Sequence, residues 1–179
     1  MHEVLEGHGE HGAHQEHPLV LPVSITLSIL AVLVAASTLM GHRAHTEELL
    51  LQAQASDQWA YYQAKSIRSR EMQSMADLLG AVAVKDTAKV EELQSKYQKE
   101  GERYDREKEE ISEKARELEK ERDLFRRRAD RFDAGEGFLE VGLIICSITM
   151  LTKKRGFWLA GMSIGAIGII AGVSGLFLH

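Results

Sequence analysis

The N-terminal tail carries the residues of this chain that are best suited to bind a metal ion. His8, His11, His14 and His17 recur at every third position, with glutamates between them. Imidazole and carboxylate groups are ligands that suit Zn²⁺, Cu²⁺ and Ni²⁺. A step of three residues aligns side chains in a three-per-turn conformation, whereas on an α-helix each step turns the side chain by about 60°. The pattern predicts either a metal site or a solvated tail that titrates near neutral pH, and both interpretations stand open.

Other polar residues suggest less chemistry. His42 and His45 have no third ligand beside them, so we interpret them as polar residues at a membrane interface. Glu140 lies just inside an apolar segment, where a carboxylate either has a function or reaches water one turn away. The chain contains no Gly-rich phosphate loop, zinc-protease motif, nucleophile elbow or paired-cysteine signature. We therefore expect a protein that is not an enzyme and has no cofactor other than a metal ion on the tail.

Three apolar segments enclose a charged middle region and predict an integral membrane protein. They are Leu19–Met40, Phe138–Leu151 and Phe157–Leu178. A helix needs about 20 apolar residues to cross a bilayer, so the outer two segments are long enough and the middle one is marginal. The tail at 1–18 contains no Lys or Arg, which excludes a secretory signal peptide and favours an uncleaved anchor. We predict an all-α chain with transmembrane helices at 19–40, 138–151 and 157–178.

The middle region, 41–136, is predicted to be a soluble helical hairpin with arms at about 42–79 and 88–132. Good helix formers fill the first arm, and the first transmembrane helix is expected to continue into it without a break. One helical stripe runs along this arm: Leu49, Ala53, Ala60, Ala64, Ile67, Leu78 and Val82. Positive and negative charges alternate and nearly balance in this region, which argues against nucleic-acid binding.

The second arm carries the clearest repeat in the chain. Hydrophobic residues stand seven apart at Val90, Tyr97, Tyr104, Ile111, Leu118, Phe125 and Phe132. A sustained seven-residue repeat is typical of a coiled-coil seam, which needs a partner helix to bury it. Because the arms match in length, we predict an antiparallel pairing with the tip near Gly80. The segment 133–137, Asp-Ala-Gly-Glu-Gly, is expected to interrupt the helix before the second apolar segment.

Small residues form a regular pattern in two of the apolar segments. Spacings of three and four place them on one helix face in each: Ser24, Ser28, Ala31, Ala35 and Thr38 in the first, and Gly161, Gly165, Gly168, Gly172 and Gly175 in the third. In lipid, helices associate through close packing, which small residues permit. We predict that both faces pack against helices, and the sequence leaves open whether these belong to the same chain or to another.

Two stretches of the first arm are distinctive. They read Gly-His-Arg-Ala-His-Thr-Glu at 41–47 and Asp-Gln-Trp-Ala-Tyr-Tyr-Gln-Ala-Lys-Ser-Ile-Arg at 57–68. Together with the His/Glu-rich tail and the three-span plan, they make the chain similar to an uncharacterised family of small bacterial membrane proteins known by a domain-of-unknown-function label. The resemblance implies a bacterial membrane protein. It implies no activity, cofactor or catalytic residue.

These patterns together favour a homo-oligomeric membrane scaffold or assembly protein that projects a coiled-coil hairpin. The expected partners are a second copy of the chain, the lipid bilayer and an unidentified protein at the hairpin, with no nucleic acid. The resemblance implies the bacterial inner membrane, and the basic residues beside the spans predict a hairpin in the cytoplasm and a tail outside. Lys153, Lys154 and Arg155 oppose that orientation. The alternatives are a metal or pH sensor that uses the tail, and an accessory subunit of a larger membrane complex.

Overall fold

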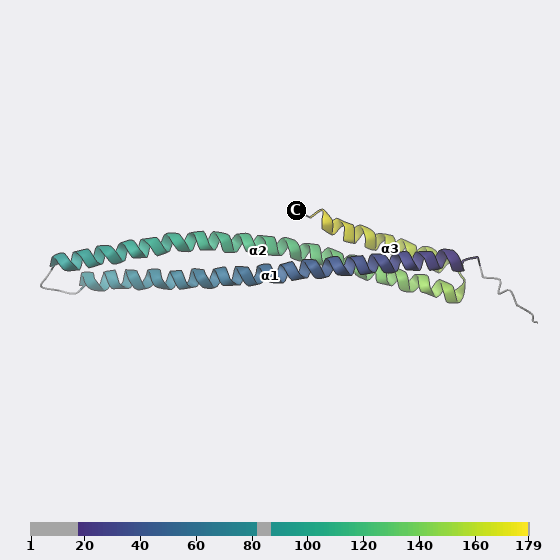
Figure 1. Cartoon of the computed structure of the whole chain (residues 1–179), viewed down its shortest axis with the longest axis horizontal. Coiled ribbons are helices and arrows are strands. Elements are labelled where there is room, and N and C mark those ends of the chain that lie inside the picture. Colours follow the sequence, from purple (N-terminus) through teal and green to yellow (C-terminus); the bar gives the residue numbers. More distant parts are fainter. Residues whose placement is uncertain (1–17, 82–86, 179) are drawn as a thin grey trace, which may run out of the picture.

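The chain folds into three helices, two of them very long. The computed structural model describes residues 18–81 and 87–178. Helix α1 is Val20–Ala81, α2 is Thr87–Thr152 and α3 is Arg155–Leu176. Figure 1 shows α1 and α2 side by side along the whole molecule, with α3 beside one end. The described residues contain no strand, which confirms the all-α prediction for this part of the chain.

Helix α1 runs without interruption from the apolar segment into the charged one, as the sequence predicts. Pro22 lies in its first turn, where the missing N–H group has no helical partner to lose. Gly41 stands at the transition and does not break the helix. We call residues 20–40 of α1, residues 138–152 of α2 and helix α3 the apolar end, and residues 42–81 and 87–132 the arms.

Helix α2 also continues through the segment where the sequence predicts a break. Residues 133–137 are helical throughout, so the expected interruption is wrong. Gly135 is buried against α3, where a side chain at this position would overlap the backbone of Gly172. Close packing between helices thus overrides the weak helix propensity of glycine. The helix ends at Thr152, after which Lys153 adopts a left-handed backbone with φ 56°.

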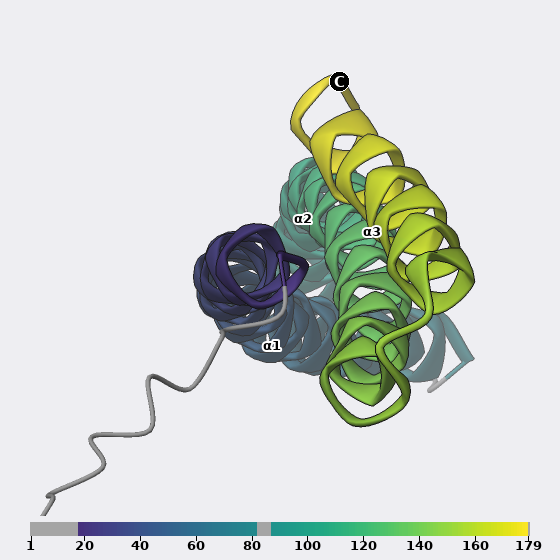
Figure 2. The ribbon, with the colours of Figure 1, turned by 90° about the vertical axis from the view of Figure 1, so that its right-hand side faces the viewer.

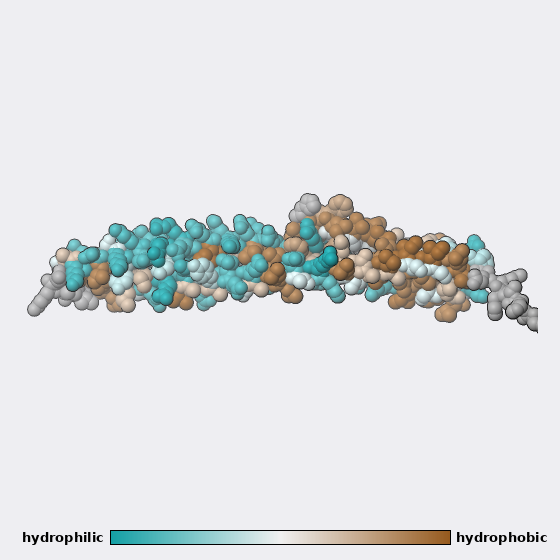
Figure 3. Space-filling model, in the orientation of Figure 1, coloured by the Kyte–Doolittle hydropathy of each residue, from teal (hydrophilic) through white to brown (hydrophobic). Residues whose placement is uncertain are grey.

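Hydrophobic and charged residues are separated along the molecule. Figure 3 shows brown, apolar residues concentrated at the end where α3 lies and teal, polar residues over the arms. Each of the three helices contains a stretch long and apolar enough to cross a membrane. Most large apolar side chains at this end are exposed, such as Leu21, Val32 and Ile170, which a bilayer would cover. The composition therefore indicates membrane association.

Helix α2 occupies the middle of the apolar end. It packs against both α1 and α3, whereas α1 and α3 touch at few points, as the end view in Figure 2 illustrates. The core of this end consists of Leu30, Leu139 and Cys146, with Trp158 packed beside them. The indole Nε1 of Trp158 donates a hydrogen bond of 3.1 Å to Thr26 Oγ1, which joins α3 to α1 near the α2–α3 turn.

The arms contact each other through small side chains. On α1 the buried positions follow steps of seven, four, fourteen and seven: Ala44, Leu51, Ala55, Ser69 and Ala76. On α2, Gly101, Ala115 and Ala129 are buried at intervals of two heptads. Of the predicted seam, Ile111 and Phe132 are buried and the other five residues are half-buried. The α1 stripe at Leu49, Ala53, Ala60, Ala64, Ile67 and Leu78 is exposed, so it faces away from α2; Val82 lies outside the described residues.

Candidate functional site

Polar contacts fix the register of the two arms. Lys65 Nζ lies 2.5 Å from Glu107 Oε2, and Ser69 donates a hydrogen bond of 2.7 Å to Asp105 Oδ1. Partner numbers rise along α1 as they fall along α2, which is the signature of an antiparallel pair. The hydrogen bond from Lys65 lowers the pKa of Glu107, and the same contact raises the pKa of Lys65.

Asp105 accepts from three groups and is the most connected carboxylate between the arms. Lys108 Nζ lies 2.6 Å from its Oδ1, and Gln73 Nε2 donates to its Oδ2 over 3.1 Å. The Lys108 contact, followed by that of Ser69, lowers the pKa of Asp105. These contacts are specific in geometry, but each exposed ion pair contributes little to stability.

The distinctive sequence of the first arm lies against α2. Trp59 Nε1 donates a hydrogen bond of 2.9 Å to Glu119 Oε1, and its ring meets that of Tyr62 edge-on at 5.5 Å. The ammonium of Lys65 lies over the rings of Tyr61 at 5.3 Å and Tyr104 at 5.0 Å. The tryptophan, the tyrosines and the lysine therefore act in arm pairing, and they enclose no pocket for a substrate.

A polar junction joins the arms to the apolar end; we use this name for Ser37, Thr38, Gly41, His45 and the facing residues of α2. Ser37 Oγ is buried and donates a hydrogen bond of 3.0 Å to the main-chain oxygen of Phe132. Thr38 Oγ1 donates to Glu136 Oε1 over 2.6 Å. A methyl group added at Gly41 would lie 3.0 Å from Asp133 Oδ1, so this glycine allows the helices to approach closely.

His45 connects the two helices at the junction. Its Nε2 lies 2.9 Å from Asp133 Oδ2 and its Nδ1 lies 3.3 Å from Glu48 Oε2. The hydrogen bond to Asp133 is the main reason that the pKa of His45 is raised above its ordinary value, and Glu48 adds to the effect. Within residues 18–81 and 87–178 no group of three or more His, Cys, Asp or Glu side chains is placed to hold a metal ion.

The glycines of α3 pack against α2 of the same chain. Gly161, Gly165, Gly168 and Gly175 are buried, and Gly172 lies at the edge of the same face. A methyl group at Gly161 would overlap Cys146 Sγ and lie 2.7 Å from the main-chain oxygen of Gly142. At Gly168 it would lie 2.8 Å from the main-chain oxygen of Gly135. The helix axes are thus close enough that no side chain fits between them.

The partners of these glycines on α2 were not identified from the sequence. Gly135, Gly142 and Cys146 stand at steps of seven and four on one face of α2, so the same small-residue spacing would have indicated them. Cys146 is a buried free cysteine and packs here as a small side chain against Gly161.

The small-residue face of α1 has a different environment. Ser28, Ala31 and Ala35 are exposed, and Ser24 and Thr38 are half-buried. The side of α1 that meets α2 carries Val23, Leu30 and Ser37 instead. Glu136, which contacts Thr38, and Glu140, one turn later on the same face of α2, border this surface. The first small-residue face therefore remains uncovered within one chain.

The predicted metal ligands of the tail, His8, His11, His14 and His17, lie outside the described residues. The domain of unknown function DUF4337 matches residues 21–178. That range includes the three helices apart from Val20 and lies wholly outside the tail at 1–18. No curated protein and no solved structure matches the chain.

Proposed function

This chain belongs to the DUF4337 family, and we propose that it is a non-enzymatic, homo-oligomeric scaffold of the bacterial inner membrane. In this proposal the apolar end spans the bilayer three times and the paired arms project into water as a coiled-coil hairpin. The apolar stretches of the three helices support the spanning arrangement. The described residues form a rod whose arms are joined by polar contacts between side chains of the two helices, which favours a structural role.

The distribution of basic residues supports a cytoplasmic hairpin. Arg43 and the cluster Arg126, Arg127, Arg128 and Arg131 flank the apolar end on the side of the arms. Basic residues near span ends favour the cytoplasmic side. The turn at Lys153, Lys154 and Arg155 lies on the opposite side with fewer positive charges. The N-terminal tail would then lie outside.

The observation that carries the proposal is the contrast between the two small-residue faces. Glycines of α3 are covered by α2, while Ser28, Ala31 and Ala35 of α1 are exposed on the surface that lipid or another protein would contact. Packing of small residues drives helix association in lipid. The carboxylate of Glu140 is exposed beside this face, and burying it against another subunit would remove it from lipid. A second copy packed on this face satisfies both features.

The arms offer a second surface for self-association. Leu49, Ile67 and Leu78 have exposed fractions of 69%, 50% and 59%. They belong to the stripe of α1 that faces away from α2. Exposed apolar rows on a water-soluble helix are typical of an interaction surface. A neighbouring hairpin would cover this stripe without displacing any contact between the arms.

Cysteine cross-linking in membranes tests the proposed interface. In a Cys146→Ser background, Ala31→Cys should form a disulfide-linked dimer on mild oxidation. Ile29→Cys is the matched control, because Ile29 is exposed but lies about 200° around α1 from Ala31. Cross-linking through residue 29 and not through residue 31 would contradict the proposed face. A chain that runs as a monomer in native mass spectrometry, without cross-links at either site, would overturn the scaffold proposal.

A further inference from the structure

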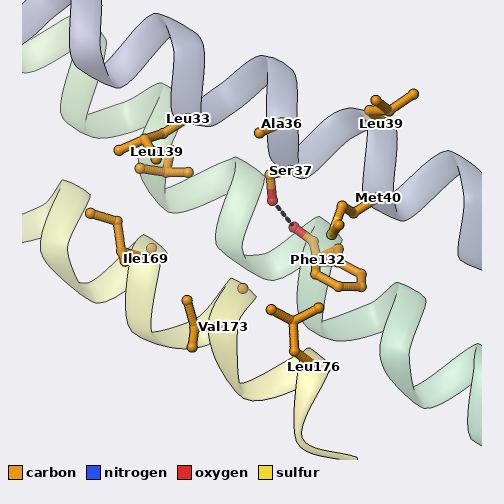
Figure 4. A pocket seen from close by; sticks show the side chains of 12 residues that line it. Leu33, Ala36, Ser37, Leu39, Met40, Phe132, Leu139, Ile169, Val173 and Leu176 are labelled. Carbon is orange, nitrogen blue, oxygen red and sulfur yellow. Dashed lines mark hydrogen bonds between the residues drawn. The ribbon is translucent and has the colours of Figure 1, made fainter.

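An apolar groove opens between α1 and α3 near the junction. Figure 4 shows its walls, with Leu33 and Met40 on α1, Ile169 and Val173 on α3, and Phe132 of α2 between the two. Its volume is about 240 Å³. The hydroxyl of Ser37 in this lining already donates to the main-chain oxygen of Phe132. The groove thus presents hydrocarbon, and an apolar cavity of about 150 Å³ accepts a molecule of benzene's size.

The groove arises because α1 and α3 diverge. Trp158 joins them near the α2–α3 turn, and Gly165 of α3 approaches the side chain of Leu30. Toward the junction the two helices separate, as Figure 1 shows by the rise of α3 away from α1. The groove therefore lies within the apolar end and opens toward the level where the charged arms begin.

A basic cavity continues the groove at this level. It has a volume of about 210 Å³ and shares Met40, Phe132 and Leu176 with the groove. Its charged lining consists of Arg43, Arg128 and Glu47, so positive charge exceeds negative charge by one. The two cavities together form one continuous surface, which is apolar within the apolar end and basic where the arms begin.

The two arginines are positioned differently. The Arg128 guanidinium is held by the main-chain oxygen of Leu178, at 3.2 Å from Nε and 2.7 Å from Nη2, and it lies 5.3 Å from the Phe125 ring. Arg43 is exposed and forms no ion pair with the described part of the chain. Arg131 contributes its Cβ atom to the contact with Gly175 of α3 and does not line the cavity.

We propose that the groove and the basic cavity together bind one anionic phospholipid. An acyl chain would lie in the groove, and the phosphate would contact Arg43 and Arg128. Guanidinium groups bind phosphate oxygens through charge-assisted hydrogen bonds, and basic pockets between membrane helices recognise anionic headgroups. This inference rests on the membrane placement proposed above, but not on the oligomeric state.

A lipid fits this surface better than a helix from a second copy. The proposed contact residues Ala31 and Ala35 lie about 180° and about 140° around α1 from Met40, which lines the groove. The apolar helices of a second copy would bring hydrocarbon but no phosphate to Arg43 and Arg128. A lipid whose phosphate and acyl chain are covalently joined supplies both components at the required positions.

Native mass spectrometry of the full chain in a neutral detergent tests the proposal. Phosphatidylglycerol and phosphatidylcholine with the same acyl chains are the probes. The unaltered chain should retain phosphatidylglycerol about tenfold more strongly, since both lipids carry the phosphate but Arg43 and Arg128 would repel the choline cation of phosphatidylcholine. The double variant Arg43→Gln/Arg128→Gln should bind both lipids equally. Arg70→Gln/Arg116→Gln, with exposed arginines on the arms, is the control and should keep the preference.

A second variant and a competitor examine the acyl chain. Ala36→Phe places a ring in the groove and should reduce retention of both lipids. Excess inorganic phosphate should not displace phosphatidylglycerol, because it cannot use the groove. Equal retention of the two lipids by the unaltered chain, an undiminished preference in the Arg43→Gln/Arg128→Gln variant, or complete displacement by phosphate would overturn the proposal.

The outcomes separate this inference from the scaffold proposal. A monomeric chain that retains phosphatidylglycerol selectively would overturn the scaffold and support the lipid site. An oligomer that retains both lipids alike would overturn the lipid site alone. If Ala36→Phe dissociates the oligomer without affecting lipid retention, the groove holds a second copy and the lipid proposal is wrong. If alkaline carbonate released the chain from membranes, the chain would not be embedded in the bilayer. Both the scaffold proposal and the lipid proposal would then be wrong.

Discussion

Gly161 of α3 lies directly against Cys146 of α2, so that a methyl group added at residue 161 would overlap the cysteine sulfur. The same closeness recurs where Gly142 faces Gly161 and Gly165. Helices α2 and α3 therefore form one tightly packed unit within a single chain. The self-association that we propose for the apolar end would therefore use another surface, the small-residue face of α1.

Replacing a buried glycine of this unit should destabilise the protein. In Gly168→Ala the new methyl group would lie 2.8 Å from the main-chain oxygen of Gly135 and 2.9 Å from the main-chain nitrogen of Leu139. Overpacking of this kind costs about 1–3 kcal/mol. Gly137→Ala is the matched control, because nothing lies within 4 Å of its added methyl group, and it should be neutral or stabilising by up to about 1 kcal/mol. Thermal unfolding in detergent, followed by circular dichroism, compares the two; equal shifts would contradict the described packing.

The contact between the arms should be sensitive to side-chain size at Ala115. This residue is fully buried, with an exposed fraction of 0%, so Ala115→Leu should lower the free energy of unfolding by about 1–3 kcal/mol. Ala60→Leu adds the same atoms on the exposed face of α1 and should change it by less than about 0.5 kcal/mol. Denaturant unfolding in detergent measures both. A larger effect at residue 60 than at residue 115 would mean that the arms pair through other faces.

His45 should make the junction pH-dependent. Because Asp133 raises the pKa of folded His45 above the ordinary 6.5, protonation stabilises the fold. This contribution is complete below about pH 6.5 and is lost as the pH rises through the raised pKa. The thermal midpoint of the unaltered chain should therefore fall over that interval more than that of His45→Gln. Asp133→Asn should reduce the difference in the same way. Parallel pH profiles of the unaltered chain and His45→Gln would show that the contact has no energetic role.

Enlarging the small-residue face of α1 should weaken self-association. Ala35→Leu introduces a bulky side chain where close approach of two helices is expected, so the fraction of oligomer in native mass spectra should fall severalfold. Ile29→Leu, which conserves volume on another side of α1, should leave the oligomer unchanged. Since Ala35 is exposed in the chain, the thermal stability of the monomer should hardly change. An oligomer that persists in Ala35→Leu would place the interface elsewhere.

The sequence predicted the helical arms well but not the side of α1 that pairs. The stripe with Leu49, Ile67 and Leu78 was the visible apolar row, yet it faces away from α2. The pairing side instead carries Ala55, Ser69 and Ala76, which contribute little to a hydrophobic pattern. Helices that approach closely need small residues more than large ones, so a search for leucine at heptad positions finds the wrong face.

The break predicted at 133–137 failed for a related reason. Asp133, Gly135 and Gly137 stand within five residues, which indicates a helix end when only local propensity is considered. Gly135, however, is required by the approach of Gly172, and Gly137 lies on the open side of the helix. Only the neighbouring α3, which follows much later in the chain, explains this glycine. The contacts of His45 with Asp133 could not be predicted either, because they depend on the register of the two arms.

The unbroken course of α1 and α2 has a mechanical consequence. With 62 residues, α1 is about 93 Å long, and no hinge separates the lipid-level turns from the distant tip. In the proposed membrane arrangement, helices α1 and α2 would tilt together about the junction. A tilt of about 10° among the apolar turns would sweep the tip, about 60 Å away, sideways by about 10 Å. In the proposed membrane arrangement, a change in bilayer thickness that tilts the apolar turns would therefore appear at the far end as a larger displacement.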